Sequence, residues 1–570
     1  MAARALGLGT ERAIFSDALR HQRSGRTGKA VKLFERLLER NPHHPEALLM
    51  LGVLRSEAAD LDGAETLFRR RLADTPTDSF TLHNLAKLHQ RRGQDASAIE
   101  LFRKAIAGTP FPPTFNDLGV SLHRTGSLAD ALTAFDRAIV LDPDYAMAYS
   151  NRGLVLIDLD RPQEAADAFR EELKRAPGSA EAWCHLGTAC HKSGDLAGAE
   201  AACRRALELD PGCIDAYLQL SLTLDRAHRP AEAEDFGTEW ARRQRVLTRS
   251  CVTGKPEARV LILAGSRMCN VPTEFLLSNR RFETTTVHLL PPGAASAEEI
   301  DALKRLPEHD LCFNAIGEVD RGEIFLPEAG AFCAGLSCPV LNRPEEMPRT
   351  RRDRVLSLLS GIPNLVLPET RRVTRAELAT LAESAALPQT LLVRPIGAHG
   401  GDDLQRIETP ADLAAYLREI ANEHHYLTQY CDYRSPDGHY RKYRFVFVDR
   451  ETFPYHLAIA DDWLVHYWRA DMTRAQWMRD EEEAFLADYT QAFPSALANT
   501  IQEIGRRLDL DYGGVDCAIT PDGRVLFFEA NATMLVHLAD RHQDFAYKKA
   551  YVPRIFDAMS AMIQRRIKGG

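Results

Sequence analysis

The chain has 570 residues and a formal net charge of −9, from 71 basic and 80 acidic side chains. This length exceeds what one ordinary hydrophobic core supports, so we expect two or more domains. Hydrophobic residues make up 45% and charged residues 26%, which are globular averages and argue against a disordered chain. The acidic balance argues against nucleic acid or an anionic membrane surface as a partner.

These features together predict a soluble cytoplasmic protein. No stretch approaches the roughly 18 uncharged apolar residues that a membrane-spanning helix needs. Residues 1–23 lack an apolar segment followed by a small-residue cleavage site, so we expect no signal peptide. The eleven cysteines are scattered without a CxxC pair, which suits a reducing compartment and predicts neither a disulfide framework nor a zinc site.

The first half of the sequence repeats itself with a period of about 34 residues. Prolines recur at this step at Pro42, Pro76, Pro110, Pro143, Pro177 and Pro211. Alanines recur at Ala30, Ala64, Ala98, Ala131, Ala165 and Ala199, and four residues after each comes Phe34, Phe68, Phe102, Phe135, Phe169 or Cys203. Small residues form a further register at Gly52, Ala86, Gly119, Gly153, Gly187 and Ser221. Independent registers with one period indicate an internal repeat.

Each repeat contains two helical patterns, for example residues 46–61 and 62–76. The proline blocks continuation of the helix, and the small residues allow close helix packing. The alanine-to-phenylalanine step of four places both side chains on one buried helix face. The pattern resembles the tetratricopeptide repeat family over residues 11–246, with six full units and a seventh pair that has Gly237 in the phenylalanine position.

The resemblance implies an all-α superhelix, a solenoid, whose concave face binds a peptide or protein segment. An alternative is that the array mediates only self-association or rigid spacing.

Near residue 247 the period stops, and residues 246–257 are expected to be a linker. Apolar β-type runs then follow at residues 258–265, 284–290, 309–317 and 338–342, with helical patterns between them. This alternation predicts an open, mostly parallel, Rossmann-like α/β unit over residues 258–345. The absence of GxGxxG argues against a dinucleotide site.

The order of strand and helix patterns changes in residues 346–565 and is typical of an α+β domain with antiparallel sheets. Residues 390–407 are predicted to form a strand, a glycine-rich loop and a second strand. Further strands are expected within 425–433, 440–450 and 454–468, and a helix over 495–510. Residues 511–533 are predicted to form a hairpin with a turn at Pro521-Asp522-Gly523.

The final hairpin contains a candidate metal site. Glu529 and Asn531 share one strand face because they lie two residues apart. Pairing across the turn can bring Asp516 beside them. Three oxygen donors without sulfur or imidazole suit Mg²⁺, which binds through carboxylates and substrate phosphates. The alternative is a solvated hairpin with acids placed by chance, but the flanking apolar runs favour burial.

The glycine-rich loop is a candidate phosphate-binding element. Gly397, Gly400 and Gly401 allow the backbone to approach phosphate closely, and Arg394 precedes the loop on a strand. The loop lacks GxxxxGK[ST], so it is not a P-loop, and a plain hairpin is the alternative. Residues 426–433 run from a strand into an irregular connection, which suits a hinge alongside a purine base.

Together these segments resemble the ATP-grasp superfamily over residues 258–565, with the α/β unit in the place of that family's preceding domain. The family pattern of Asp followed by Glu-x-Asn on a final hairpin matches residues 516, 529 and 531. Its Lys-Pro before a glycine-rich flap matches residues 394–395, with arginine for lysine. Its second basic residue, before a helix leading to Gly-Ile-Pro, matches Arg351 or Arg352, again arginine for lysine.

The resemblance implies a set of site residues. It assigns Mg²⁺ to Asp516, Glu529 and Asn531. It assigns the phosphates to Arg351 or Arg352, together with Arg394, Gly397, Gly400 and Gly401. It assigns adenine to Gln429, Tyr430 and Cys431, and the ribose to Asp432. It further implies an ATP- and Mg²⁺-dependent ligase that phosphorylates a carboxylate and lets an amine or thiol displace the phosphate.

The sequence gives less information about the residues that bind the substrate. Arg444 and Arg469 are candidates for holding the substrate carboxylate, or each pairs with a nearby acid instead. The fused repeats favour a peptide or protein-borne substrate. Two alternatives remain: a non-catalytic scaffold or nucleotide sensor that binds proteins through the repeats, and a kinase that leaves the phosphate on its product.

Overall fold

The computed structural model describes residues 2–265, 270, 273–303, 305–398, 401, 403–466, 470–532, 534–538 and 543–569. The chain divides into two compact units, Met1–Ala227 and His228–Gly570. The division falls inside the predicted seventh helix pair, so the second helix of that pair, α14 (Pro230–Arg243), belongs to the C-terminal unit.

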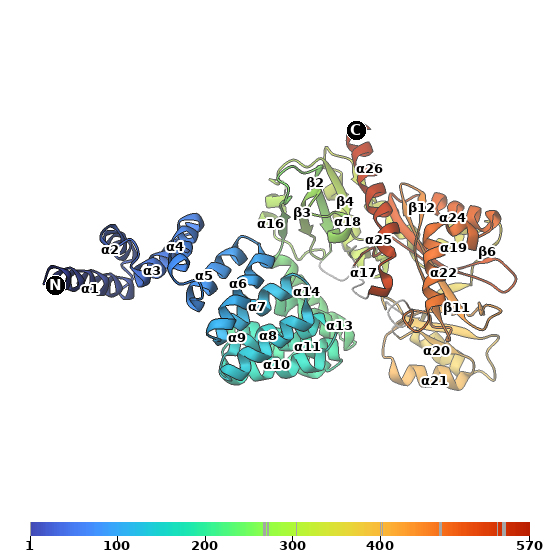
Figure 1. The fold of residues 1–570 in the computed structure, drawn as a ribbon. Coiled ribbons are helices and arrows are strands. Elements are labelled where there is room, and N and C mark those ends of the chain that lie inside the picture. Colours follow the sequence, from blue (N-terminus) through green and yellow to red (C-terminus); the bar gives the residue numbers. More distant parts are fainter. Residues whose placement is uncertain are drawn as a thin grey trace. The chain divides into compact units, whose positions relative to one another are not determined.

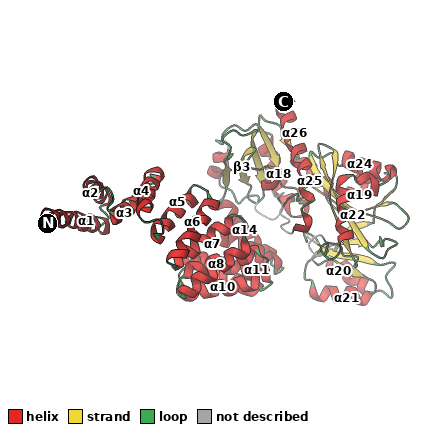
Figure 2. Ribbon diagram, in the orientation of Figure 1, coloured by secondary structure: helices red, strands yellow, loops and turns green. Residues whose placement is uncertain are grey.

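The N-terminal unit is built from paired α-helices throughout its described residues, 2–227 (Figures 1 and 2). The first helix begins at Ala2, before the predicted start at residue 11. The helices are α1 Ala2–Arg23, α2 Thr27–Arg40, α3 Pro45–Glu57, α4 Leu61–Asp74, α5 Ser79–Arg91, α6 Asp95–Gly108, α7 Pro112–Arg124, α8 Leu128–Leu141, α9 Ala146–Asp158, α10 Pro162–Arg175, α11 Ala180–Ser193, α12 Leu196–Leu209 and α13 Ile214–Arg226. The predicted helical-repeat solenoid is therefore confirmed.

The repeated glycines explain how the two helices of a unit pack. A Cβ atom added at Gly153 in α9 would lie 2.6 Å from the ring of Phe169 in α10, and one added at Gly119 would lie 2.5 Å from the ring of Phe135. The phenylalanines of this register are fully buried. The first helix of each unit therefore has a small residue where the aromatic ring of the second helix fills the space.

The C-terminal unit begins with a five-stranded sheet in the order β1-β3-β2-β4-β5. Its strands are β1 Val246–Arg249, β2 Ala258–Ala264, β3 Phe282–His288, β4 Leu311–Asn314 and β5 Val340–Leu341. Strands β2 to β5 are parallel, as predicted. Part of the expected linker is instead strand β1, which pairs antiparallel with β3 at the sheet edge. The described helices that accompany this sheet are α15 Thr273–Leu276, α16 Ala297–Leu303, α17 Val319–Gly322 and α18 Leu326–Cys333.

Two further sheets form the remainder of this unit. The smaller, antiparallel sheet has the order β7-β10-β8-β9 and comprises β7 Thr370–Thr374, β8 Leu391–Pro395, β9 Gln405–Ile407 and β10 His424–Gln429, with α20 Arg375–Ala382 and α21 Pro410–Glu419. The larger has the order β12-β11-β13-β14-β6 and comprises β6 Leu365–Val366, β11 Tyr440–Val448, β12 Glu451–Ala460, β13 Tyr512–Ile519 and β14 Val525–Asn531. The predicted hairpin over residues 511–533 is β13–β14.

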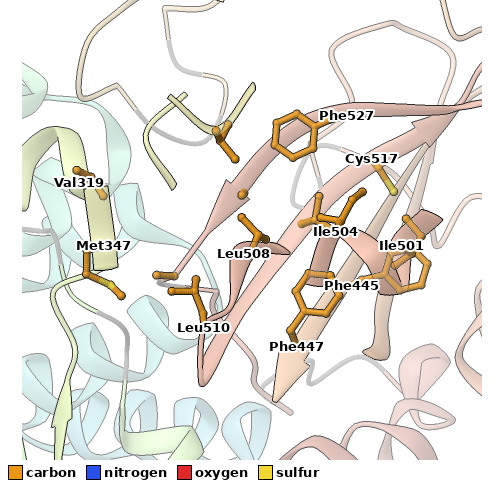
Figure 3. Packing of buried hydrophobic residues seen from close by; sticks show 14 of the residues in the cluster. Val319, Met347, Phe445, Phe447, Ile501, Ile504, Leu508, Leu510, Cys517 and Phe527 are labelled. Atoms are coloured by element: carbon orange, nitrogen blue, oxygen red, sulfur yellow. The ribbon is translucent and has the colours of Figure 1, made fainter. Parts of the chain in front are cut away.

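Helices cover the larger sheet and complete the unit. They are α19 Val355–Leu359, α22 Gln476–Ala487, α23 Tyr489–Ala492, α24 Ser495–Leu508, α25 Lys548–Tyr551 and α26 Pro553–Gly569. Ile501, Ile504 and Leu508 of α24 pack against Phe445 and Phe447 of β11 (Figure 3).

The same buried cluster extends from this sheet to Leu261 and Leu263 of the parallel sheet. The predicted boundary at residues 345/346 therefore lies within one continuous core. Among the described residues, no helix is both long enough and apolar enough to cross a membrane.

Candidate functional site

A cavity of about 270 Å³ lies between the smaller, antiparallel sheet of the C-terminal unit and the larger sheet, which is antiparallel except that β6 pairs parallel with β14. The smaller sheet contributes Arg394 from β8 and Gln429 from β10, and the larger sheet contributes Lys442 from β11. Glu318, from the loop after β4, also lines the cavity. Polar residues from segments that are far apart in the sequence therefore meet in one place.

A row of polar side chains crosses the larger sheet beside this cavity. Glu529 on β14 lies opposite Asp516 on β13, and Asp516 lies opposite Arg444 on β11. Arg444 in turn lies opposite His456 on β12. Directly opposed residues on adjacent strands place their side chains on the same sheet face. The predicted approach of Asp516 to Glu529 therefore follows from the hairpin register.

The carboxylate of Asp516 is fully buried and has two cationic partners. Arg444 Nε and Nη2 donate to its two oxygens at 2.6 and 2.8 Å, and Lys442 Nζ lies 2.7 Å from Oδ2. Burial alone would raise the pKa of Asp516, but these two cations outweigh burial and hold the pKa well below its ordinary value. Asp516 is therefore ionised throughout the physiological range.

Glu529 is held in the same manner by another arginine. Its Oε2 accepts a hydrogen bond from Arg352 Nη2. Burial would raise the pKa of Glu529, but Arg352, with Lys442 and Arg394 nearby, lowers it to about 2. Two adjacent carboxylates repel each other, and these cations allow both to remain charged in a buried site.

The hairpin provides oxygen donors that fit a hard divalent cation. Asn531 lines the cavity together with Glu529, and Asp516 lies directly across from Glu529. Two carboxylates and an amide oxygen are ligands that Mg²⁺ accepts when phosphate and water complete its shell. Among the described residues, no cluster of three or more His, Cys, Asp or Glu suited to a metal occurs.

The glycine-rich loop begins directly after Arg394. Gly397 and Gly401 have positive φ angles of 84° and 78°, which favour glycine. Arg394 Nη2 donates to the carbonyl oxygen of Ala398, within this loop. Burial and the nearby Arg352 lower the pKa of Arg394 to about 10, so the guanidinium is still charged at neutral pH. Arg321 of α17 donates from Nε to the Gly397 carbonyl at 2.6 Å.

The predicted hinge lines the opposite part of the cavity. Gln429, Tyr430 and Cys431 all contribute to its wall. The guanidinium of Arg406 lies 4.3 Å from the ring centre of Tyr430 and fixes that ring. Asp432, by contrast, is exposed and does not line the cavity, and its Oδ1 accepts from the backbone N–H of Arg434 at 3.1 Å. The neighbouring residues Cys431 and Tyr433 do line the cavity, and the ribose contact of Asp432 stays a prediction.

The sequence left open whether Arg351 or Arg352 is the phosphate-binding arginine, and the structure distinguishes the two. Arg352 lines the cavity, whereas Arg351 pairs with Asp353 at 2.7 Å and with Glu323 at 3.3 Å. Nε and Nη2 of Arg444 both bind Asp516, which corresponds to the predicted alternative that this arginine pairs with a nearby acid. The predicted residues Arg469 and Gly400 lie outside the described residues.

Two acidic or basic residues of the cavity wall, Lys442 and Glu318, were not predicted from the sequence. Lys442 shares the strand face of Arg444, and the alternation Lys-x-Arg in residues 442–444 was the available signal. Glu318 is preceded by a β-type run, but nothing local connects it with the final hairpin. Burial raises the pKa of Glu318 to about 7, although Arg352 opposes the rise.

Family models match four segments of the N-terminal unit. Models described as tetratricopeptide repeat match residues 22–88, 81–109 and 150–212, and one described as TPR repeat matches residues 119–160. The N-terminal unit is a tetratricopeptide repeat array. Such arrays bind peptides or protein segments on an extended surface, so this unit is a protein-interaction module.

Individual relatives are similar to short parts of the chain. Protein FlbA of Caulobacter vibrioides is 29% identical over 165 residues, which are 29% of this chain and 28% of FlbA. The protein adenylyltransferase Fic of Nematostella vectensis is 42% identical over 69 residues, 12% of this chain and 16% of that protein. The chain therefore spans less than a third of the length of these relatives.

A solved structure of MamA, residues 41 to the end, from Desulfovibrio magneticus RS-1 is 24% identical. The match covers 30% of this chain and 96% of the MamA chain, with a TM-score of 0.29.

Proposed function

We propose that residues 258–565 form an ATP- and Mg²⁺-dependent carboxylate–amine or carboxylate–thiol ligase of the ATP-grasp type. The main support is the cavity between the smaller and the larger sheet of the C-terminal unit. One part of it has the cationic side chains Arg352, Arg394 and Lys442 around Glu529, and another part has the hinge residues 429–431. Cations beside oxygen donors suit a triphosphate with its metal, and a partly apolar hinge suits a base.

In this proposal, Glu529, Asn531 and Asp516 hold Mg²⁺, which neutralises phosphate charge when bound. Arg352 and Arg394 would bind phosphate oxygens, with backbone N–H groups of the glycine-rich loop as further donors. Both arginines need to exchange a partner, since Arg352 now binds Glu529 and Arg394 binds Ala398. The hinge backbone and the Tyr430 ring orient the base.

The proposed reaction has two steps. A carboxylate oxygen of the substrate attacks the γ-phosphorus, the bond to the β-phosphate oxygen breaks, and ADP leaves. The amine or thiol then attacks the acyl carbon, and inorganic phosphate leaves as the proton passes to solvent. Lys442 and Arg444 lie where they offset charge on the transferring group, so the chain contributes positioning and electrostatic stabilisation.

Binding and turnover of MgATP test this proposal. MgATP should raise the thermal midpoint of the full chain by mass action. ADP release should require Mg²⁺ and an acid with an amine or thiol acceptor, and phosphate should appear in solution. Glu529→Gln should abolish ADP release. MgATP binding with phosphate retained on the product would indicate a kinase instead.

A second candidate function is a non-catalytic scaffold or nucleotide sensor. It is favoured by the observation that Glu529 and Asp516 already have cationic partners within the chain. A scaffold would bind proteins through the repeats alone. Absence of any thermal shift with MgATP supports this second candidate, and binding without ADP release under every acceptor mixture supports a sensor.

The repeats have a proposed role in substrate recruitment. An interaction module fused to a ligase suits a substrate that is carried on a peptide or protein. Turnover of such a substrate should fall in a chain that begins at residue 228, while turnover of a small free substrate should remain. Equal turnover of the peptide-borne substrate by both chains would contradict recruitment by the repeats.

A further inference from the structure

A second, smaller cavity of about 50 Å³ adjoins the first. Lys442, Arg444 and His466 line both cavities, so the two meet at these side chains. His456 and His537 complete an imidazole-rich wall. We call this space, with Tyr455 and Leu535, the three-histidine pocket.

The pocket is formed by two strands and the segment that follows the final hairpin. His456 on β12 lies opposite Arg444 on β11, so the two face the pocket from adjacent strands. The Tyr455 hydroxyl accepts the backbone N–H of His537 at 3.0 Å, which fixes residues 534–538 beside β12. His456 and His537 are 4% and 6% exposed, so the polar wall is buried.

The lining defines the chemistry of a ligand. Lys442 and Arg444 are the two cations of the lining, and both pair with the carboxylate of Asp516, which does not itself line the pocket. Three imidazoles supply N–H donors and nitrogen acceptors. Leu535 is the one aliphatic lining residue among those described. This lining suits one negative charge and neighbouring hydroxyl or amino groups, and it disfavours an alkyl chain.

We propose that the three-histidine pocket binds a short, polar carboxylic acid, which is the phosphoryl acceptor of the ligase reaction. This assignment rests on the proposed function, which places the triphosphate in the larger cavity. The shared residues Lys442 and Arg444 lie between the pocket and the pair Asp516–Glu529, so a carboxylate bound there adjoins the transferring phosphoryl group. Acids such as L-lactate, L-malate and L-aspartate represent the class, and octanoate represents the excluded long-chain acids.

Isothermal titration of the full chain with each acid, with and without a non-hydrolysable MgATP analogue, tests the assignment. We expect at least one of the three polar acids to bind and octanoate not to bind. His456→Gln and His537→Gln, at residues that line the smaller cavity and not the larger one, should weaken that binding at least tenfold while leaving the affinity for the MgATP analogue unchanged. The matched control is His424→Gln, an exposed histidine at the start of β10, which should change neither affinity. Circular dichroism establishes that each variant is folded.

The outcomes separate this inference from the proposed function. If the MgATP analogue binds but no polar acid does, or if octanoate binds equally well, the pocket assignment is wrong and the nucleotide site stands. If a polar acid binds with the same affinity in the histidine variants, the assignment is also wrong. If the analogue does not bind, the proposed function fails, and the acid titration alone decides whether the pocket binds an acid. Acid binding that His537→Gln weakens supports the pocket, and no acid binding overturns it.

Discussion

Asp516 on β13 lies directly across from Glu529 on β14, and each of these carboxylates is bound by an arginine from another segment. Arg444 reaches Asp516 from the neighbouring strand, and Arg352 reaches Glu529 from the segment before α19. The two acids remain ionised in a buried site because of these partners. The same arrangement concentrates positive charge where a triphosphate would bind.

Arg444→Met should destabilise the C-terminal unit by about 3 kcal/mol, because it leaves the buried Asp516 with Lys442 alone. Urea unfolding followed by tryptophan fluorescence reports this unit, since four of the five tryptophans lie in it. Arg506→Met is the control, because the Arg506 side chain is 73% exposed and its loss should cost less than about 1 kcal/mol. Adding Asp516→Asn to Arg444→Met should restore part of the stability; no restoration would show that the loss is not electrostatic.

Gly153→Ala should destabilise the repeat array by about 1–3 kcal/mol, because the new methyl group meets the buried ring of Phe169 at 2.6 Å. Hydrogen exchange of the full chain should show faster exchange in α9 and α10. Gly178→Ala is the matched control, since a Cβ there meets nothing within 4 Å. Equal exchange in both variants would mean that the glycine register has no packing role.

Glu172 should make the stability of the array depend on pH. Burial raises its pKa to about 7, against an ordinary value of 4.5, although a hydrogen bond from Ser150 opposes the rise. Between these values the folded chain binds a proton that the unfolded chain has released. Stability should therefore fall as pH rises from 4.5 to 7 and stay level above that range.

Glu172→Gln should remove this pH dependence and stabilise α10 above pH 7. Hydrogen exchange in α10, corrected for the intrinsic rate at each pH, measures the effect. A variant with the same pH profile as the natural chain would show that another group titrates in this range.

The repeat fold could be predicted because its information is local and repeated. Every 34 residues the same small and aromatic positions recur, and each pair such as Gly153 and Phe169 meets within one unit. The end of the array could not be located in this way. Helix α14 has the helical pattern of a repeat, but its contacts assign it to the C-terminal unit.

The candidate site was predictable only in part from the final hairpin. The turn at residues 521–523 pairs Cys517 with Phe527, and a register shift between Cys517 and Asp516, which the sequence does not announce, then places Asp516 opposite Glu529. Lys442 and Glu318 could not be assigned, because they reach the cavity through packing between strands and loops far apart in the sequence. The choice between Arg351 and Arg352 likewise depends on which side chain faces the cavity.

The most direct test of the central claim is a crystal structure of the chain with Mg²⁺ and a non-hydrolysable ATP analogue. We predict a cation within about 2.0–2.1 Å of oxygens of Glu529, Asn531 or Asp516. We also predict that Arg352 and Arg394 bind the triphosphate and that the base lies beside residues 429–431. A structure with the analogue absent from this cavity at saturating concentration, and with the Arg352–Glu529 and Arg444–Asp516 pairs unchanged, would contradict the ligase proposal.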